Sequence, residues 1–163
     1  ITQDPDLSSS TADIFIAGKL NQRGYWQQLL HKERLIPVCS PSFYLKWRDI
    51  SLSNFQQQAL LVVDEGPLGL DWHKWSSAHQ IPLDNEQQHV FSHIVMAIEA
   101  AIAGQGLALA PDFMVAGDIT TGRLVALNLP DVHTGFEFTF FCKQRRLSEP
   151  AIAAFSSWLK SQA

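Results

Sequence analysis

The chain has 163 residues, of which 46% are hydrophobic and 17% are charged, and its formal net charge is −4. A chain of this length forms about one domain, and its apolar content excludes an intrinsically disordered protein. No apolar run approaches the roughly 20 residues of a membrane-spanning helix, so we expect no membrane insertion. Lys143, Arg145 and Arg146 form only a short basic patch, and we therefore expect no DNA binding by this chain itself.

The first residues predict a fragment of a longer protein. The chain begins with Ile1, and residues 1–10 lack the basic cluster and the apolar stretch of a signal peptide. Cys39 and Cys142 lie in strand-like stretches, which favours buried free thiols, although a disulfide between them stays open as an alternative.

Three short apolar runs in the first part of the chain predict buried strands. They are residues 13–17, 35–40 and 59–63, and Gly, Pro or a turn-rich segment ends each of them. After the third run, Asp71 is a candidate N-cap for a helix that places Trp72, Trp75 and His79 on one face.

A strand at residues 89–91 leads into the most regular helical pattern. Ser92 is the expected N-cap, and Gly104 fits the position just past the helix end. The inward face of this helix consists of Ile94, Ile98, Ala101 and Ile102.

Strands and helices continue to alternate up to the last residues. We expect strands at 107–110, 124–129 and 136–142, a helix from Pro111 to Gly122, and a final helix that residues 148–150 open. Such alternation predicts an α/β fold with mostly parallel strand pairing.

A pair of glycines and a pair of histidines are candidates for a nucleotide-binding loop and a metal site. Gly104 and Gly106 suggest a nucleotide loop, but a helix precedes them and a strand follows, which is the reverse of the dinucleotide-binding order. His89 and His93 would share a face only if both were helical. We therefore predict no cofactor and no metal.

An enzyme is the less favoured class. The sequence contains no nucleophile motif, and the adjacent carboxylates Asp64 and Glu65 lie in a Gly-Pro turn, where such pairs are usually only solvated. A binding module is favoured instead, since open α/β sheets bind ligands where strand ends meet helix starts. The junction at residues 91–93 and the turn at residues 17–19 are two such places.

Several segments in order resemble LysR-type transcriptional regulators. The long stretch FSHIVMAIEAAIAGQGLALAPDFMVAGDI at residues 91–119 resembles the most recognisable part of that family. ADIFIAG at 12–18, ERLIPVCSPSF at 33–43, TGRLV at 121–125 and PAIAAFSSWLK at 150–160 continue the resemblance. PVCSP and the W-x-x-W helix resemble the subgroup of glycine-cleavage and β-lactamase regulators.

The resemblance implies a periplasmic-binding-protein-like (type 2) α/β fold, in which two lobes with mostly parallel sheets and helices on both faces enclose a small-molecule cleft. Lobe I would hold residues 1–34 and 135–163, and lobe II residues 35–134. The family's winged helix-turn-helix domain, its linker helix and the first strand and helix of its effector domain are absent from this sequence. Ala17 stands where relatives often carry arginine.

The resemblance also implies the function of an effector-sensing domain in a cytoplasmic, bacterial transcription regulator that is not an enzyme. Its partners would be a small metabolite, further copies of itself in a dimer or tetramer, and DNA only through the absent N-terminal domain. The helix start at Ser92 favours an anionic metabolite, because free N–H groups and the helix dipole attract negative charge there. Self-association would use residues 22–31 and 72–79. A free-standing solute-binding protein of the same fold is the alternative, and a small hydrolase or transferase is a third possibility.

The expected effector-binding residues follow the strand ends of both lobes. They are Ala17, Gly18, Lys19, Asp64, Phe91, Ser92, His93 and Pro111. For Ser92, two roles stay open, namely capping the helix and bonding the ligand, while His93 could add a contact that depends on protonation.

Overall fold

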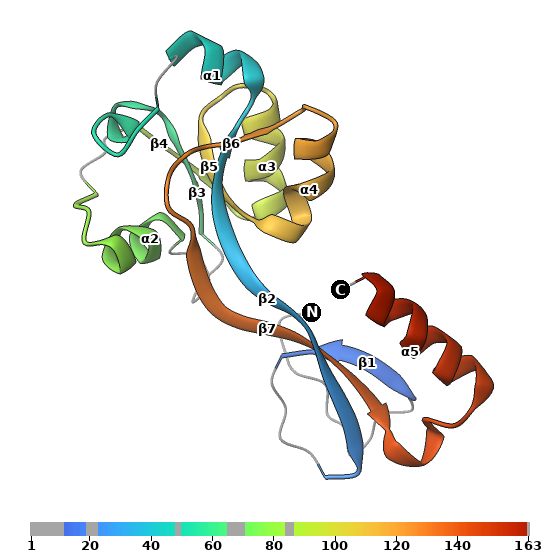
Figure 1. Ribbon diagram of the computed structural model, residues 1–163. Helices are drawn as coiled ribbons and strands as arrows, with labels where there is room; N and C mark the ends of the chain where they lie inside the picture. Colours follow the sequence, from blue (N-terminus) through green and yellow to red (C-terminus); the bar gives the residue numbers. More distant parts are fainter. Residues whose placement is uncertain (1–11, 19–22, 48–49, 65–70, 84–86, 163) are drawn as a thin grey trace. The chain divides into compact units, whose positions relative to one another are not determined.

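The computed structural model describes residues 12–18, 23–47, 50–64, 71–83 and 87–162. The chain divides into two compact units: unit 1 comprises residues 1–33 and 135–163, and unit 2 comprises residues 34–134. Two long strands carry the chain from one unit to the other, β2 (Tyr25–Cys39) and β7 (Val132–Lys143) (Figure 1). Unit 2 is therefore a continuous stretch of chain, whereas unit 1 combines two separate stretches.

The sheet of unit 2 is mixed. Its further strands are β3 (Leu60–Val63), β4 (Gln88–Phe91), β5 (Leu107–Pro111) and β6 (Val125–Ala126), with the order β2-β5-β3-β4 and β6 paired to β2. β3 is parallel to β4 and β5, whereas β2 is antiparallel to β5 and β6. The expectation of mostly parallel pairing thus holds only for β3, β4 and β5. Intervening helices return the chain between these strands, whereas β2 enters from the other unit in the opposite direction.

Helices cover both faces of this sheet. They are α1 (Pro41–Trp47), α2 (Asp71–His79), α3 (Ile94–Ile102) and α4 (Asp112–Thr120), with the short 3-10 helix η1 (Phe55–Gln57). α3 and α4 lie on one face and α2 on the other (Figure 1). Leu60 packs on the α2 side and Leu61 on the α3 side, as the alternation of side chains along a strand requires.

An aromatic cluster fills the core on the α2 side. Phe55, Trp72 and Trp75 are fully buried, and their ring centroids lie 5.1 to 6.0 Å apart. Trp72 Nε1 donates a hydrogen bond to the carbonyl of Leu61 in β3 at 3.2 Å. The i, i+3 spacing of the two tryptophans therefore fixes α2 to the sheet, as expected from the sequence.

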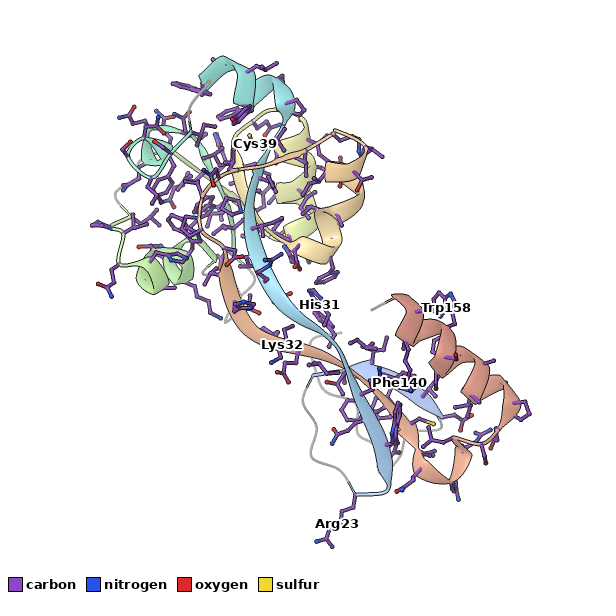
Figure 2. All side chains as sticks on the ribbon, in the orientation of Figure 1. Arg23, His31, Lys32, Cys39, Phe140 and Trp158 are labelled. Carbon is purple, nitrogen blue, oxygen red and sulfur yellow. The ribbon has the colours of Figure 1, made fainter. Side chains whose placement is uncertain are left out.

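The described part of unit 1 is a smaller layer of strands with one α-helix. β1 (Ile14–Ala17) pairs antiparallel with β7, which also lies beside β2, and α5 (Pro150–Gln162) follows the short 3-10 helix η3 (Gln144–Arg146). Phe140, Cys142 and Ile152 form its buried core, while Trp158 lies exposed on α5 (Figure 2).

The largest differences from the sequence expectations concern β2, α1 and β6. β2 begins at Tyr25, ten residues before the expected start. The sequence does not reveal this part of the strand, because residues 25–34 are too polar to form an apolar run. α1 has no counterpart among the expected elements. Ser40 caps this helix, since its Oγ accepts a hydrogen bond from Phe43 N at 3.1 Å, and Pro41 is the first helical residue. The strand expected at 124–129 shrinks to Val125–Ala126.

Both cysteines are buried free thiols, as one of the two alternatives predicted. Burial raises the pKa of the Cys39 thiol to about 12 and also raises that of Cys142. Within the described residues, no helix is long and apolar enough to span a membrane.

Arg146 joins the start of α5 to the strand layer of unit 1. Its Nε donates to Glu149 Oε1 at 2.6 Å, and its Nη1 pairs with Asp13 beside β1. The Arg146 guanidinium lowers the pKa of the Glu149 carboxyl. Because the folded pKa lies below the unfolded one, Glu149 stabilises unit 1 above the unfolded pKa and loses this effect as the pH falls through the folded pKa.

We therefore expect Arg146→Met to lower the melting temperature at pH 7, with the difference from wild type shrinking as the pH approaches 3. Thermal denaturation followed by circular dichroism across this range checks the prediction. The exposed Arg145 lies in the same turn and makes the smallest contribution to the lowered pKa of Glu149, so Arg145→Met is the control and should show a much weaker dependence on pH. A difference for Arg146→Met that is independent of pH would contradict the role of Glu149.

Candidate functional site

The carboxyl ends of β3, β4 and β5 form one edge of the unit 2 sheet. Val63 pairs with Phe91, and Asp64 N donates to Phe91 O at 2.8 Å, so Asp64 and Ser92 follow neighbouring strand ends. β3 and β5 are parallel with Leu61 opposite Ala108, a register that brings Asp64 level with Pro111. The structure thus gathers the predicted site residues of unit 2 at a single edge.

At this edge α3 begins one residue later than expected. His93 is the N-cap residue, with extended backbone at φ −146° and ψ 144° and no capping hydrogen bond from its side chain. The prediction that Ser92 caps the helix is therefore wrong. Ser92 Oγ instead lies 2.9 Å from His93 Nδ1 and 3.6 Å from Met96 Sδ, and both Ser92 and His93 are exposed.

This arrangement makes the start of α3 suited to an oxyanion. The N–H groups in the first turn of any α-helix lack acceptors within the helix, and the helix dipole favours negative charge there. When His93 is neutral with its proton on Nε2, its Nδ1 can accept a hydrogen bond from the Ser92 hydroxyl. When His93 is protonated, Nδ1–H donates to Ser92 Oγ, which frees the hydroxyl to donate elsewhere.

The end of β5 carries an ion-pair network that the sequence analysis missed. Asp112, the first residue of α4, follows Pro111, and its Oδ2 lies 3.3 Å from Arg34 Nε. Arg34 Nη1 also lies 3.0 Å from Asp131 Oδ2. Two carboxylates therefore compensate the charge of Arg34. In the sequence, only the position of Asp112 directly after Pro111 could have indicated this network. Its partner Arg34 is 78 positions away, so no local pattern connects the two residues.

The predicted residues of lobe I lie in unit 1. Ala17 ends β1 opposite Thr139, and Gly18 follows it. Lys19 lies outside the described residues. That these residues face the edge of unit 2 stays a prediction.

The glycine and histidine patterns have structural roles. Gly104 has φ +78° and ends α3, as expected. A Cβ on Gly106 would lie 2.3 Å from the carbonyl oxygen of Ala59, so this glycine permits close backbone packing. His89 lies in β4 and His93 at the start of α3, so the two do not share a helical face. In the described part of the chain, no three His, Cys, Asp or Glu residues cluster as metal ligands would.

The chain is similar to known proteins in both sequence and structure. Residues 5–163 match the family described as LysR substrate binding domain. The glycine cleavage system transcriptional activator of Escherichia coli (strain K12) is 29% identical over 162 residues, which cover 99% of this chain and 52% of that protein. The chain thus spans about half the length of this curated relative, whose subgroup is one that the sequence resembles.

Solved structures share the fold. The effector domain of the transcriptional regulator AmpR of Pseudomonas aeruginosa superposes with a TM-score of 0.65 at 24% identity, covering 97% of this chain and 75% of that chain. The AmpR effector binding domain from Citrobacter freundii gives 0.68 at 24% identity, with 97% and 78% covered. The periplasmic-binding-protein-like fold expected from the sequence is therefore confirmed.

Proposed function

Because the chain belongs to the LysR substrate binding domain family, we propose that it is the effector-sensing part of a transcription regulator. In this function it binds a small metabolite, and a different part of the longer protein contacts DNA. The sequence match to an activator and the shared fold with the effector domain of a regulator support this function over a free-standing solute-binding protein. We propose no catalytic role for it and place its action in the cytoplasm, where regulators meet DNA.

The edge of unit 2 at Asp64, Ser92 and Pro111 is the proposed effector site. The carrying observation is that the Ser92 hydroxyl lies at the start of α3 without capping it. An effector carboxylate would receive hydrogen bonds from this hydroxyl and from the first-turn amides of α3. Asp64, on the same edge, disfavours a second negative charge on the effector.

Ser92→Ala in the longer regulator tests this function. We expect the response of a reporter gene to the effector to be lost while the melting temperature changes little, because no capping hydrogen bond is removed. Exposed substitutions of this kind usually change stability by less than about 0.5 kcal/mol. Ser77→Ala on the exposed side of α2 is the matched control and should change neither quantity.

The opposite pattern would contradict the site. An intact effector response in the Ser92→Ala protein, whatever its melting temperature, would mean that the hydroxyl does not contact the effector. Loss of the response in both serine variants would point to a general defect in the regulator.

Self-association is the second part of the proposal. Trp72 and Trp75 are buried, so only the outward residues of α2 are available to a partner copy. Exposed apolar side chains gather instead on β4 and the first turn of α3, where Val90 is 63% exposed, Val95 56% and Met96 52%. Among the described strands, β4 is also the last in the sheet order on its side, and strands at such a position favour pairing between copies.

A further inference from the structure

Residues 130–134 lead the chain out of unit 2 and include the first three residues of β7, and α2 holds this return segment by its main chain. Three donors of α2 reach three carbonyl oxygens: Trp75 Nε1 reaches Pro130, His79 Nε2 reaches Asp131 at 2.8 Å, and Lys74 Nζ reaches Thr134. A carbonyl only accepts, so His79 Nε2 carries the proton in this contact. Because Trp75 is fully buried, α2 gives the return segment a rigid support.

Arg34 connects the same segment to the proposed effector edge. It precedes Leu35, which pairs with Pro111 at the end of β5. Its Nε contacts Asp112 in the first turn of α4, and its Nη1 contacts Asp131 in the return segment. The side chain of Arg34, which itself lies in β2, thus contacts both the effector edge and the segment that leads out of the unit.

The chemistry of this contact suits an adjustable link. The planar fork of a guanidinium can serve two carboxylates at once, which an ammonium group does poorly. The side chain of Arg34 is 42% exposed, so solvent screens the pairs and each is modest in strength. A modest contact can weaken or shift when α4 moves, whereas the support from α2 stays in place.

We propose that Arg34 is a positioning residue that couples the β5–α4 edge to the return segment. A displacement of α4 at the effector site then shifts the return segment, residues 130–134, through which the chain leaves unit 2. The inference rests on the proposed function, since it takes that edge as the effector site. The coupling itself is a property of the chain without effector, which makes it separately measurable.

Hydrogen exchange on the 163-residue chain without effector tests the coupling through a double-mutant cycle. The variants are Arg34→Gln, Asp112→Asn and both together. Asp112→Asn retains an oxygen that can accept from Phe113 N, a contact of 2.9 Å, but removes the charge that Arg34 holds. We expect Asp112→Asn to speed exchange at residues 132–134 about two- to fivefold when Arg34 is present. In the Arg34→Gln background it should add nothing.

Matched variants separate coupling from general loosening. Arg123→Gln breaks an exposed pair with Asp118 on the same helix and should leave exchange at residues 132–134 unchanged. Arg34→Lys retains the charge without the fork and should not restore wild-type exchange. Amides of residues 97–101 in α3 should exchange alike in all variants.

Two results would overturn the inference. One is an Asp112→Asn effect of the same size with and without Arg34, and the other is no effect of Asp112→Asn at residues 132–134. Neither depends on the effector, so a failure here is distinct from a failure of the Ser92→Ala test. Conversely, an unresponsive effector site would leave the measured coupling intact while removing its role in sensing.

Discussion

Replacing Trp72 with alanine is expected to lower the free energy of unfolding of unit 2 by about 3–5 kcal/mol. The side chain is fully buried and packs on Phe55 and Trp75, so its removal leaves a cavity that the rigid neighbouring rings cannot close. The carbonyl of Leu61 also loses its hydrogen bond from Trp72 Nε1. Urea denaturation followed by circular dichroism measures the change without relying on tryptophan fluorescence.

Trp158→Ala is the matched control for this experiment. The Trp158 side chain is 55% exposed on α5 (Figure 2), and it contacts only Phe155 among the described aromatic rings. We expect its replacement to lower stability by less than about 1 kcal/mol. Equal losses for the two variants would show that the aromatic cluster around Trp72 does not dominate the core on the α2 side.

Gly106→Ala is expected to destabilise unit 2 by about 1–3 kcal/mol, the range typical of overpacking. The added Cβ would lie 2.3 Å from the carbonyl oxygen of Ala59, and backbone atoms cannot rotate away as a flexible side chain does. The same carbonyl accepts a hydrogen bond from Leu107 N at 2.9 Å, so any shift disturbs the pairing of β3 with β5.

Gly117→Ala provides a control with the opposite sign. Gly117 lies inside α4, and a Cβ there would meet no atom of the described residues within 4 Å. Since alanine favours a helix over glycine by about 1 kcal/mol, this variant should be more stable than wild type. Denaturant midpoints below wild type for Gly106→Ala and above wild type for Gly117→Ala would confirm both predictions. A wild-type midpoint for Gly106→Ala would contradict the close packing at this glycine.

The sequence predicted those elements whose pattern is local. The strand at 59–63, the tryptophans of α2 and the face of α3 formed where expected because a continuous apolar run or a 3.6-residue period is visible in the local sequence. Residues 25–34 of β2 lacked such a period. Their strand depends on pairing with β7, more than 100 positions away, which no local pattern reveals.

The candidate site was predictable only in outline. Strand ends and helix starts indicated the edge at Asp64, Ser92 and Pro111, but two adjacent polar residues, Ser92 and His93, could each begin α3. The local pattern predicted Ser92 as the N-cap, whereas the N-cap is His93, whose backbone is extended and is followed by the first helical residue, Ile94. The link from Arg34 to Asp131 joins residues 97 positions apart, and folding alone brings them together.

The division of the chain also has a consequence for its synthesis. Unit 2 is a continuous stretch, whereas unit 1 needs β1 near the beginning and both β7 and α5 near the end. During translation all of unit 2 emerges from the ribosome before the strand that completes unit 1. β1 and the start of β2 therefore emerge more than 100 residues before β7, the strand that pairs with both. We expect a chaperone to protect β1 and the start of β2 during this interval.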